Sequence, residues 1–413
     1  MSRPPLPDGP YLVVGLARSG VAAMGALRAR GIEVAGVDRR HGQDGLAELD
    51  RAAVVVKSPG VPQDAPVIAE ARRRGITVMG ELELAWRLLP NRFVAVTGTN
   101  GKTTTVALLG HVLGSRAVVA GNVGTALSGL DVPEDVIVVA EASSFQLEDT
   151  IAFAPDVAAL INLTEDHLDR HGTFAAYREA KMQAFARQRP DQVAVLPDGF
   201  SAPGEARRIR FGGAETADLR LAGGALWWRG ERLLGVEELR LRGAHNVQNA
   251  MVAAAVAHAL GAGREGIVSG LRTFAGVAHR LEEVAERDGV LYVNDSKATN
   301  VDSTIVALRS FPSGVRLILG GRGKGQDFTP LRALVAERCA SVHLIGEDGG
   351  RIADAIGGGE RDGDLERAVE HARRLARPGD VVLLSPACAS YDQYEDFEAR
   401  GEHFRRLASR PAG

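Results

Sequence analysis

The chain has 413 residues, of which 45% are hydrophobic and 24% are charged, and this balance excludes a disordered chain, a collagen-like rod and a coiled coil. At about 100–200 residues per domain, the length excludes one small module and predicts two to four domains, with three as the central expectation. The net charge of −3, from 49 basic and 52 acidic residues, leaves no electrostatic footprint for nucleic acid or an anionic membrane.

The first segment has the pattern of a Rossmann-like α/β domain. Buried strands are predicted over residues 11–16, 32–37 and 53–56. A turn through Ala17 and a helix follow the first strand, the second strand ends at Asp38, and the third leads into Lys57 and Ser58. Phosphate and ribose groups of ligands bind at such strand ends. Because Ala17 stands where the dinucleotide fingerprint has its middle glycine, an NAD site is only weakly indicated, and Lys57 can be functional or merely solvated.

The second segment opens with the context of a phosphate-binding loop. A strand over residues 93–96 is followed by the glycine-rich stretch TGTNGKTT at 97–104 and by a helix predicted over residues 106–113. The strict Walker pattern has glycine where this chain has Val96. The variant loop still offers backbone N–H groups to phosphate oxygens, the Lys102 ammonium to the outer phosphates and the Thr103 hydroxyl to magnesium. It therefore predicts a nucleoside triphosphate site.

Polar residues follow the next two strands of the same segment. Glu141 comes at the end of a strand predicted over residues 136–140, and His167 lies in the polar loop after a strand over residues 157–161. Carboxylate and imidazole groups at neighbouring strand ends can converge on a bound nucleotide. A single histidine in a polar loop is usually only solvated, but the place of His167 beside the phosphate-binding loop argues for a role.

Short strands and turns are predicted over residues 191–243, and an alanine-rich helix over residues 245–260 follows them. Asn246 and Asn249 lie in the first turn of that helix, where asparagines can be plain caps. Their position alone therefore assigns them no ligand.

The third segment begins near residue 277 and repeats the α/β alternation. Strands are predicted over residues 290–293, 315–319, 341–345 and 381–384, with helices between them. Polar clusters follow these strands at residues 294–300, 320–325 and 385–390. Since ligands of open α/β sheets bind outside the carboxyl ends of the strands, the clusters predict a ligand site there.

Lysine is rare in this chain, which uses arginine as its ordinary cation. The 49 basic residues comprise 44 arginines and five lysines, at positions 57, 102, 181, 297 and 324. A lysine differs from an arginine because its ammonium is a compact charge that can lose a proton. Codon bias alone could leave a few lysines at random positions. Four of the five nevertheless fall in or beside candidate site segments, and the fifth, Lys181, lies on a helix entered through residues 172–174.

Three features concern the compartment. Cys339 and Cys388 are the only two cysteines, too few for a disulfide framework. Residues 1–10 lack the charged and then apolar layout of a signal peptide. No apolar run reaches the roughly 18 residues that a membrane-spanning helix needs. We therefore expect a monomeric cytoplasmic protein that does not insert into membranes.

Eight motifs together resemble the Mur ligase family. They are VTGTNGKTTT (96–105), GNVG (121–124), EASSFQL (141–147), NLTEDHLDRHG (162–172), HNVQNA (245–250), HRLE (279–282), NDSKATN (294–300) and SPACASYDQYEDFEARG (385–401). The resemblance covers residues 11–407. NDSKATN and SPACAS are its specific part, because other members and folylpolyglutamate synthase share the loop and histidine motifs. The stretch LARSG at 16–20 departs from the family's N-terminal loop.

The resemblance implies three α/β domains. They are a Rossmann-like domain over residues 1–91 that binds a UDP-substrate, a central P-loop ATPase-type domain with a parallel sheet over residues 92–276, and a C-terminal Rossmann-like domain over residues 277–413 that binds the acceptor amino acid and closes on the nucleotide. The implied activity is the ATP-dependent addition of D-glutamate to UDP-N-acetylmuramoyl-L-alanine in peptidoglycan precursor synthesis. A carboxylate is a poor acyl donor, so ATP would first convert it to an acyl phosphate, and cations would neutralise the charges that meet.

The resemblance also implies roles for individual residues. The nucleotide would contact Gly98, Thr99, Asn100, Gly101, Lys102, Thr103, Thr104, Asn246, Asn249, Arg280 and Asp295. The UDP-substrate would contact Arg18, Ser19, Asp38, Arg40, Ser58, Asn122 and His167. D-glutamate would contact Thr299, Lys324, Ser390 and Phe397. Catalysis would depend on Lys102, His167, Lys181 and Lys297.

Two Mg²⁺ ions belong to the implied reaction. Thr103 would bind one of them together with the nucleotide phosphates, and Glu141, His167 and a Lys181 carbamylated by CO₂ would bind the other. Magnesium prefers oxygen ligands and a free ammonium repels it, so carbamylation turns a cation into an oxygen donor. Without the resemblance, the residue pattern favours an exposed helical Lys181 paired with Glu179.

Two alternatives remain open. Another Mur-type or folylpolyglutamate-synthase-like ligase would take a different acceptor, although SPACAS and Lys324 favour D-glutamate over a diamino acid. A catalytically silent nucleotide-binding or NAD-dependent protein would be favoured if only the first segment mattered. The presence of Lys102, Glu141, His167 and Lys181 argues against a silent protein.

Overall fold

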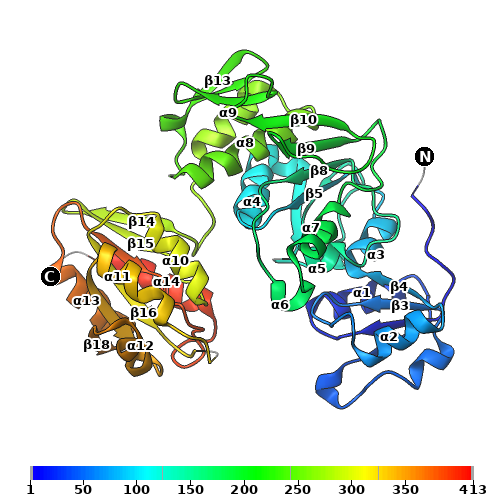
Figure 1. Ribbon diagram of the computed structural model, residues 1–413, viewed down its shortest axis with the longest axis horizontal. Helices are drawn as coiled ribbons and strands as arrows, with labels where there is room; N and C mark the ends of the chain where they lie inside the picture. The colour runs from blue at the N-terminus through cyan, green and yellow to red at the C-terminus, as the bar shows by residue number, and fades with distance from the viewer. Residues whose placement is uncertain (1–2, 123, 242, 324, 411–413) are drawn as a thin grey trace. The chain divides into compact units, whose positions relative to one another are not determined.

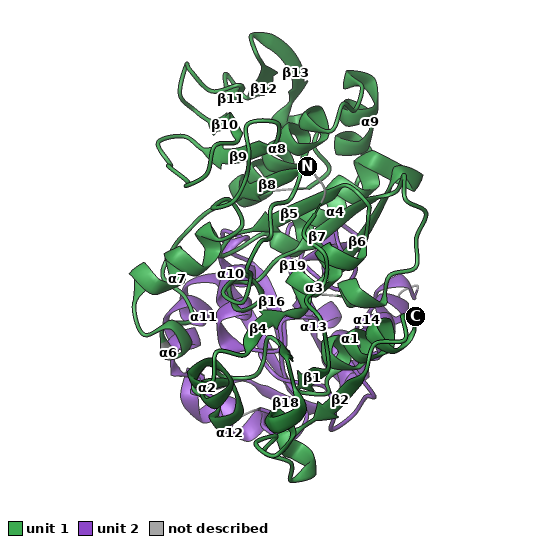
Figure 2. Ribbon diagram, turned by 90° about the vertical axis from the view of Figure 1, so that its right-hand side faces the viewer, with its two compact units in different colours: residues 1–274 green, residues 275–413 purple. Residues whose placement is uncertain are grey.

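The computed structural model describes residues 3–122, 124–241, 243–323 and 325–410 of the chain. It falls into two compact units, residues 1–274 and residues 275–413, which Figure 2 colours separately. In the described residues, unit 1 carries two sheets and unit 2 carries one, and helices alternate with the strands in each. The fold class predicted from the sequence, three α/β domains, is confirmed. The exact domain bounds stay a prediction.

The four-stranded sheet of unit 1 is parallel, with the order β2-β1-β3-β4 (Figure 1). Its strands are β1 (Tyr11–Val14), β2 (Val34–Val37), β3 (Val54–Lys57) and β4 (Thr77–Gly80), and its helices are α1 (Arg18–Arg28), α2 (Pro66–Arg73) and α3 (Glu81–Leu88). Every residue of β1 and β3 is buried, which explains their apolar runs. Because Val14 pairs in register with both Val37 and Lys57, the turns after these residues open at one edge of the sheet.

The nine-stranded sheet of unit 1 has the order β13-β12-β11-β10-β9-β8-β5-β7-β6. Its strands are β5 (Phe93–Thr97), β6 (Ala117–Gly121), β7 (Ile137–Glu141), β8 (Val157–Leu160), β9 (Val193–Pro197), β10 (Arg207–Gly212), β11 (Leu219–Ala222), β12 (Ala225–Trp228) and β13 (Glu231–Gly235). The strands pair in parallel from β6 to β11, and β12 and β13 extend the edge as antiparallel strands. The ends of β5, β7 and β8 therefore lie side by side.

Six helices accompany the nine-stranded sheet in the described residues: α4 (Lys102–Leu113), α5 (Ser144–Leu147), α6 (Leu168–His171), α7 (Phe174–Met182), α8 (Ala244–Ala259) and α9 (Arg264–Thr273). α4 packs against α8 (Figure 1), in which Val247 and every residue from 249 to 257 are buried. The helix expected from residue 106 begins a turn earlier, at Lys102. The three threonines of that turn have low helix propensity, so the apolar pattern alone places the start too late.

The sheet of unit 2 has the order β14-β15-β19-β16-β17-β18, parallel except for the antiparallel edge strand β14. Its strands are β14 (Glu282–Arg287), β15 (Val290–Asn294), β16 (Val315–Gly320), β17 (Cys339–Ile345), β18 (Glu360–Gly363) and β19 (Val381–Leu384). Its helices are α10 (Val301–Arg309), α11 (Arg332–Arg338), α12 (Gly349–Ile356), α13 (Leu365–Leu375) and α14 (Phe397–Ser409). None of the helices in the described residues of the whole chain combines the length and apolar character that crossing a membrane requires.

Candidate active site

The phosphate-binding loop lies between β5 and α4. Gly101 precedes the helix with a left-handed backbone (φ 85°), and a Cβ atom at this position would lie 2.2 Å from Asn249 Oδ1. A side chain is therefore excluded by both the backbone conformation and the space. The first N–H groups of a helix lack partners within it and favour anions, so the start of α4 suits a phosphate. Thr103 and Thr104 are half-buried in this first turn.

The Lys102 side chain folds back over the loop. Its Nζ atom donates hydrogen bonds to the carbonyl oxygens of Gly98 (2.9 Å) and Thr99 (2.8 Å). Thr99 is itself held in place, because its Oγ1 accepts from the Tyr177 hydroxyl at 3.1 Å. The backbone N–H of Asn100 donates to Asn162 Oδ1 at 2.9 Å, which ties the loop to the strand end of β8. The ammonium thus lies within the loop that is predicted to hold the outer phosphates.

Lys181 lies on α7, far from the phosphate-binding loop in the sequence, and its side chain contacts the same loop. Its side chain is buried, and its Nζ atom donates to the Gly98 carbonyl at 2.8 Å and lies 4.7 Å from the centre of the Tyr177 ring. Burial and, to a smaller extent, the nearby charge of Lys102 lower the pKa of Lys181 to about 7, although Asp166 acts in the opposite direction. The expectation of an exposed lysine paired with a carboxylate is therefore wrong.

Glu141 ends β7 and is also buried. Its Oε1 accepts a hydrogen bond from Asn122 Nδ2 at 3.0 Å, whereas its Oε2 has no hydrogen-bond partner among the described residues. A buried carboxylate oxygen without a partner is costly. A hard cation such as Mg²⁺ satisfies such an oxygen, so Glu141 fits the metal role that the family resemblance implies.

His167 precedes α6 with a left-handed backbone (φ 50°), a conformation that residues other than glycine rarely adopt. Its ring is exposed and lies 4.9 Å from the Phe145 ring and 6.3 Å from the Tyr177 ring, between ring centres. Because Lys181 also lies against Tyr177, the structure brings both predicted residues next to one aromatic ring. Their catalytic roles stay a prediction.

Asn246 and Asn249 lie in the first turns of α8, which packs beside the phosphate-binding loop. Asn249 is buried, its Oδ1 accepts from Thr105 Oγ1 (3.2 Å), and its Nδ2 donates to Asn246 Oδ1 (3.1 Å). Asn249 thus supports the loop from beneath through its contact with Gly101. The expectation that both residues contact the nucleotide stays a prediction.

A cavity of about 940 Å³ opens at the edge of the four-stranded sheet where the strands end. Its lining includes Ser19, Asp38, Arg40 and Ser58, four of the residues predicted to bind the UDP-substrate. Arg40 donates to the Asp38 carboxylate through Nε (3.0 Å) and Nη2 (2.6 Å), which is the main reason why the pKa of Asp38 lies well below its ordinary value. Arg18 borders a neighbouring hollow that Arg40 shares. The structure therefore places these five residues on one side of the domain.

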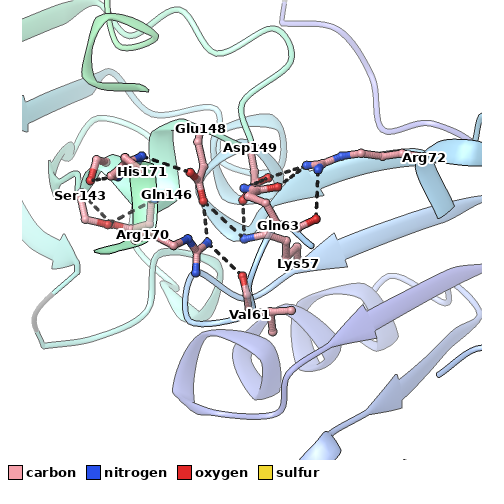
Figure 3. Close-up of polar contacts among 11 residues, drawn as sticks. Lys57, Val61, Gln63, Arg72, Ser143, Gln146, Glu148, Asp149, Arg170 and His171 are labelled. Carbon is pink, nitrogen blue, oxygen red and sulfur yellow. Dashed lines mark hydrogen bonds and ion pairs between the residues drawn. The ribbon is translucent and has the colours of Figure 1, made fainter. Parts of the chain in front are cut away.

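Lys57, whose role the sequence leaves open, is fully buried in an ion pair. Its Nζ atom lies 2.7 Å from Asp149 Oδ2 and 3.9 Å from Glu148 Oε1 (Figure 3). Both carboxylates follow α5, so the contact joins the four-stranded sheet to the part of unit 1 that contains the nine-stranded sheet. A solvated Lys57 is excluded.

Arg170 extends this ion-pair network toward the histidine loop. Its Nη2 atom donates to Glu148 Oε1 (2.7 Å) and to the Val61 carbonyl (3.0 Å), as Figure 3 shows. Val61 and Ser58 both line the cavity of about 940 Å³. Arg170 belongs to α6, the helix that follows His167. The network therefore fixes the loop after β3 relative to the histidine loop.

Replacing Lys57 with methionine is expected to lower the free energy of unfolding of unit 1 by about 3–5 kcal/mol, because the Asp149 carboxylate would stay buried without its nearest cation. The double variant Lys57→Met/Asp149→Asn should recover a large part of that loss, since it removes the second charge as well. Arg72→Ala is the matched control: Arg72 contacts the same carboxylate at 3.4 Å but is 46% exposed, so its loss should cost about 1 kcal/mol or less. Urea unfolding of the four proteins measures the coupling, and equal losses in Lys57→Met and Arg72→Ala would contradict it.

In unit 2, Asp295 lies just after β15 among polar groups. Its Oδ2 accepts from Ser385 Oγ (2.8 Å) and its Oδ1 accepts from the Leu281 N–H group (3.2 Å). Burial raises the pKa of Asp295 to about 7, while these two hydrogen bonds and the charge of Arg280 act in the opposite direction. Arg280 is exposed beside it. The predicted nucleotide residues Arg280 and Asp295 thus lie close together.

Three of the residues predicted to bind D-glutamate are described: Thr299 and Ser390 lie in the loops after β15 and β19, which pair with each other, and Phe397 begins α14. Thr299 and Phe397 are half-buried, and Ser390 is buried. The Lys297 Nζ atom lies 5.8 Å from the centre of the Phe397 ring. Lys324 lies outside the described residues. The roles of these residues toward an acceptor stay a prediction.

Arg400 is a residue that sequence reasoning missed. Its side chain is 1% exposed, its Nε donates to Ser296 Oγ (2.9 Å), and its Nη2 donates to the carbonyls of Ser296 (2.9 Å) and Cys388 (3.1 Å). It therefore ties together the two polar clusters at residues 294–300 and 385–390. A signal was present: Arg400 stands three residues after Phe397 and four before Phe404, on the apolar face of α14.

Replacing Asp295 with asparagine is expected to raise the melting temperature of unit 2 more at pH 8 than at pH 5. The folded state holds a proton on Asp295 up to about pH 7, whereas the unfolded chain releases it near pH 4. The carboxyl group therefore costs stability progressively between about pH 4 and pH 7, and the cost stays constant at higher pH. An asparagine carries no charge at either pH, and it can keep both contacts if its Oδ1 accepts from the Leu281 N–H group while its Nδ2 donates to Ser385 Oγ.

The gain in melting temperature that Asp295→Asn gives at pH 8 should exceed the gain it gives at pH 5 by at least about 4 °C. Asp288→Asn provides the control, because the Asp288 side chain is exposed and its gain should not change over this range. A gain from Asp295→Asn that is the same at both pH values would contradict the assignment.

The chain is similar to known proteins over its whole length. The family model of the Mur ligase middle domain matches residues 96–257, and that of the Mur ligase glutamate ligase domain matches residues 279–388. The chain is 44% identical to the UDP-N-acetylmuramoylalanine–D-glutamate ligase of Anaeromyxobacter dehalogenans, with 100% of both chains covered. It is 40% identical to that of Acidobacterium capsulatum, with 96% of this chain and 95% of the relative covered.

Among solved structures, the UDP-N-acetylmuramate–alanine ligase of Thermotoga maritima matches 98% of this chain and 100% of its own, with a TM-score of 0.60 and 20% identity. At that identity the match shows the shared fold alone. The two domain models together with the full-length relatives show the family. The chain therefore belongs to the Mur ligase family.

Proposed function

We propose that this protein is an ADP-forming ligase that joins D-glutamate to UDP-N-acetylmuramoyl-L-alanine in peptidoglycan synthesis. The observation that carries the proposal is the 44% identity, over 100% of both chains, to a ligase named for UDP-N-acetylmuramoylalanine and D-glutamate. ATP and Mg²⁺ serve the reactions of this family. The phosphate-binding loop of unit 1 supplies a place for the ATP phosphates, and the cavity at the four-stranded sheet supplies one for the UDP group.

The chemistry of such a ligation explains the cations around Gly98. A carboxylate must attack the γ-phosphate of ATP, so two anionic groups approach each other in line before the amine displaces phosphate. Lys102 and Lys181 both donate to the Gly98 carbonyl, which places two amines at the phosphate end of the loop. Lys102 would neutralise charge on the outer phosphates as the bond to the leaving ADP breaks.

The residues present fit two magnesium sites. Thr103 offers one ion a hydroxyl at the start of α4. For the other ion, Glu141 Oε2 is a buried oxygen without a partner in the described residues, and His167 offers an imidazole. Magnesium at these residues would neutralise phosphate charge. We propose that a carbamate on Lys181 adds an oxygen ligand. The pKa of about 7 supports this step, since only the neutral amine reacts with CO₂.

The remaining assignments follow the location of each residue. Ser19, Asp38, Arg40 and Ser58 would bind the UDP group, since they line one cavity. Thr299, Ser390 and Phe397 would contact D-glutamate together with Lys324, and Lys297 would support the phosphate and amine region. Of these unit 2 residues, Lys297, Thr299 and Ser390 lie in loops that follow strands of the sheet, and Phe397 lies at a helix start.

Phosphate release tests the proposed function. The purified chain is incubated with ATP, Mg²⁺ and UDP-N-acetylmuramoyl-L-alanine, and with D-glutamate, L-glutamate, L-alanine or diaminopimelate in separate reactions. D-glutamate should give a rate at least about 100-fold above the others, which corresponds to about 2.7 kcal/mol of discrimination. A preference for diaminopimelate would replace the acceptor but keep the ligase class, and no phosphate release with any acceptor would refute the proposal.

A further inference from the structure

Two histidines and an aspartate converge in unit 2, away from the loops assigned above. They are His343 on β17, Asp362 on β18 and His371 on α13. His343 Nδ1 lies 2.8 Å from Asp362 Oδ2, and His371 Nδ1 lies 2.9 Å from Asp362 Oδ1. One ligand atom from each residue lies within 4.8 Å of the other two. We infer that this cluster, the His–Asp–His cluster, is a site for a divalent transition metal, with zinc as the expected ion.

The donor set determines which metals fit. Two imidazole nitrogens and one carboxylate oxygen suit zinc, which takes nitrogen and oxygen ligands at about 2.0–2.2 Å and often keeps a fourth position for water. Magnesium and calcium prefer oxygen ligands, so a site in which two of the three ligands are histidines selects against them. The cluster is thus chemically different from the oxygen-rich magnesium sites proposed in unit 1.

The group behind His343 suits a metal-bound imidazole. His343 Nε2 lies 2.9 Å from Ser341 Oγ, and the Arg316 Nη1 atom donates to the same hydroxyl oxygen at 3.4 Å. With a metal on Nδ1, the neutral ring carries its proton on Nε2. The Nε2–H group can then donate a hydrogen bond to the second lone pair of the Ser341 hydroxyl oxygen. The buried ring would therefore have a partner at both nitrogens.

Exposure leaves a path for the ion. The His343 side chain is 0% exposed, but those of Asp362 and His371 are 11% and 26% exposed, so the cluster reaches solvent on the side of His371. A bound ion would connect three elements, the edge strand β18, its neighbour β17 and α13. Because β18 is short and lies at the edge of the sheet, this connection should stabilise the part of unit 2 with the fewest strand neighbours.

The same contacts also satisfy a hydrogen-bonded pair of histidines on one carboxylate without any ion. Metal binding by the whole protein distinguishes the two possibilities. The chain is stripped with a chelator, kept in about 10 mM Mg²⁺ to fill oxygen sites, and titrated with Zn²⁺ by calorimetry and with Co²⁺ by visible absorption. We expect one Zn²⁺ per chain with a Kd in the micromolar range or tighter, a four-coordinate Co²⁺ spectrum, and a higher melting temperature with Zn²⁺.

Asp362→Asn and His371→Gln should each weaken Zn²⁺ binding at least about 30-fold and abolish the thermal shift. Both positions are partly exposed, so these variants are expected to fold, and circular dichroism checks that they do. His403→Gln is the matched control, because His403 lies in the same unit and contacts Tyr394 instead of the cluster. Absence of saturable Zn²⁺ binding up to about 1 mM, or binding that both cluster variants retain within threefold, would overturn the inference.

Discussion

Replacing Lys181 with arginine is expected to lower the rate of ligation at least about 100-fold, a loss of about 2.7 kcal/mol in transition-state stabilisation. A guanidinium keeps its proton and cannot form a carbamate, so the variant would place a fixed positive charge where an oxygen ligand is proposed. Because Lys181 is buried, the longer arginine side chain cannot reach solvent from this position and must stay near Gly98. The apparent affinity for Mg²⁺ in the reaction should therefore fall together with the rate.

Initial rates and ¹³C NMR with labelled bicarbonate test this expectation together. The wild type should show a carbamate signal that Lys181→Arg lacks, while Arg178→Lys, on an exposed face of α7, should keep both signal and rate. At a constant CO₂ concentration, the neutral fraction of an amine of pKa 7 rises from about a tenth at pH 6 to about nine-tenths at pH 8. Carbamate should thus form more readily at pH 8. An active arginine variant, or no labelled carbamate in the Mg²⁺-bound wild type, would show the assignment to be wrong.

Replacing Lys102 with alanine is expected to abolish measurable ATP turnover, with a loss of at least about 100-fold. The lysine compensates the outer phosphates where charge redistributes in the reaction, and no other lysine of the described chain lies on the loop itself. Binding of the UDP-substrate should survive, because the cavity of about 940 Å³ lies on the four-stranded sheet. Calorimetry with the UDP-substrate and phosphate release with all substrates separate the two effects.

The Lys102→Ala variant has a second readout. Since the charge of Lys102 lowers the pKa of Lys181, its removal should raise that pKa and reduce carbamate formation at pH 7. Retention of more than about a tenth of the wild-type rate, a loss of less than about 1.4 kcal/mol, is incompatible with the role proposed for Lys102. The conservative variant Lys102→Arg keeps the charge and should therefore leave the pKa of Lys181 low while still impairing turnover.

The apolar runs of the chain predicted the buried strands well. β1, β3, β5 and β19 are buried along their whole length, so their residues form easily recognised apolar runs, interrupted only by Lys57 at the end of β3 and Thr97 at the end of β5. The edge strands β14 and β18 were missed because their sequences, EEVAER and ERDG, are charged and partly exposed. Edge strands depend on pairing with a neighbour, which no local pattern records.

In the candidate site, residues whose type follows from ligand chemistry could be predicted from the sequence. Residues whose role depends on how the chain packs were harder to predict. Glycine at 101 and lysine at 102 follow from phosphate binding, and motif resemblance located Glu141, His167 and Lys181. Lys57 and Arg400 are different, because each is a charged side chain whose burial depends on partners far away in the sequence. Asp149 is 92 positions from Lys57 and Ser296 is 104 positions from Arg400, as the numbering shows. Only the folded chain reveals that these charges are internal.

The carbonyl oxygen of Gly98 receives hydrogen bonds from both Lys102 and Lys181. These two hydrogen bonds hold the loop in shape, with the Gly98 carbonyl oxygen accepting where an anionic ligand would otherwise accept. When a triphosphate arrives, Lys102 can exchange a neutral oxygen for a charged one while Lys181 continues to hold the backbone. Nucleotide affinity then depends on the difference between the hydrogen bond of Lys102 to the Gly98 carbonyl and its bond to the phosphate. Because the loop is already ordered before the nucleotide binds, the entropic cost of association is lower.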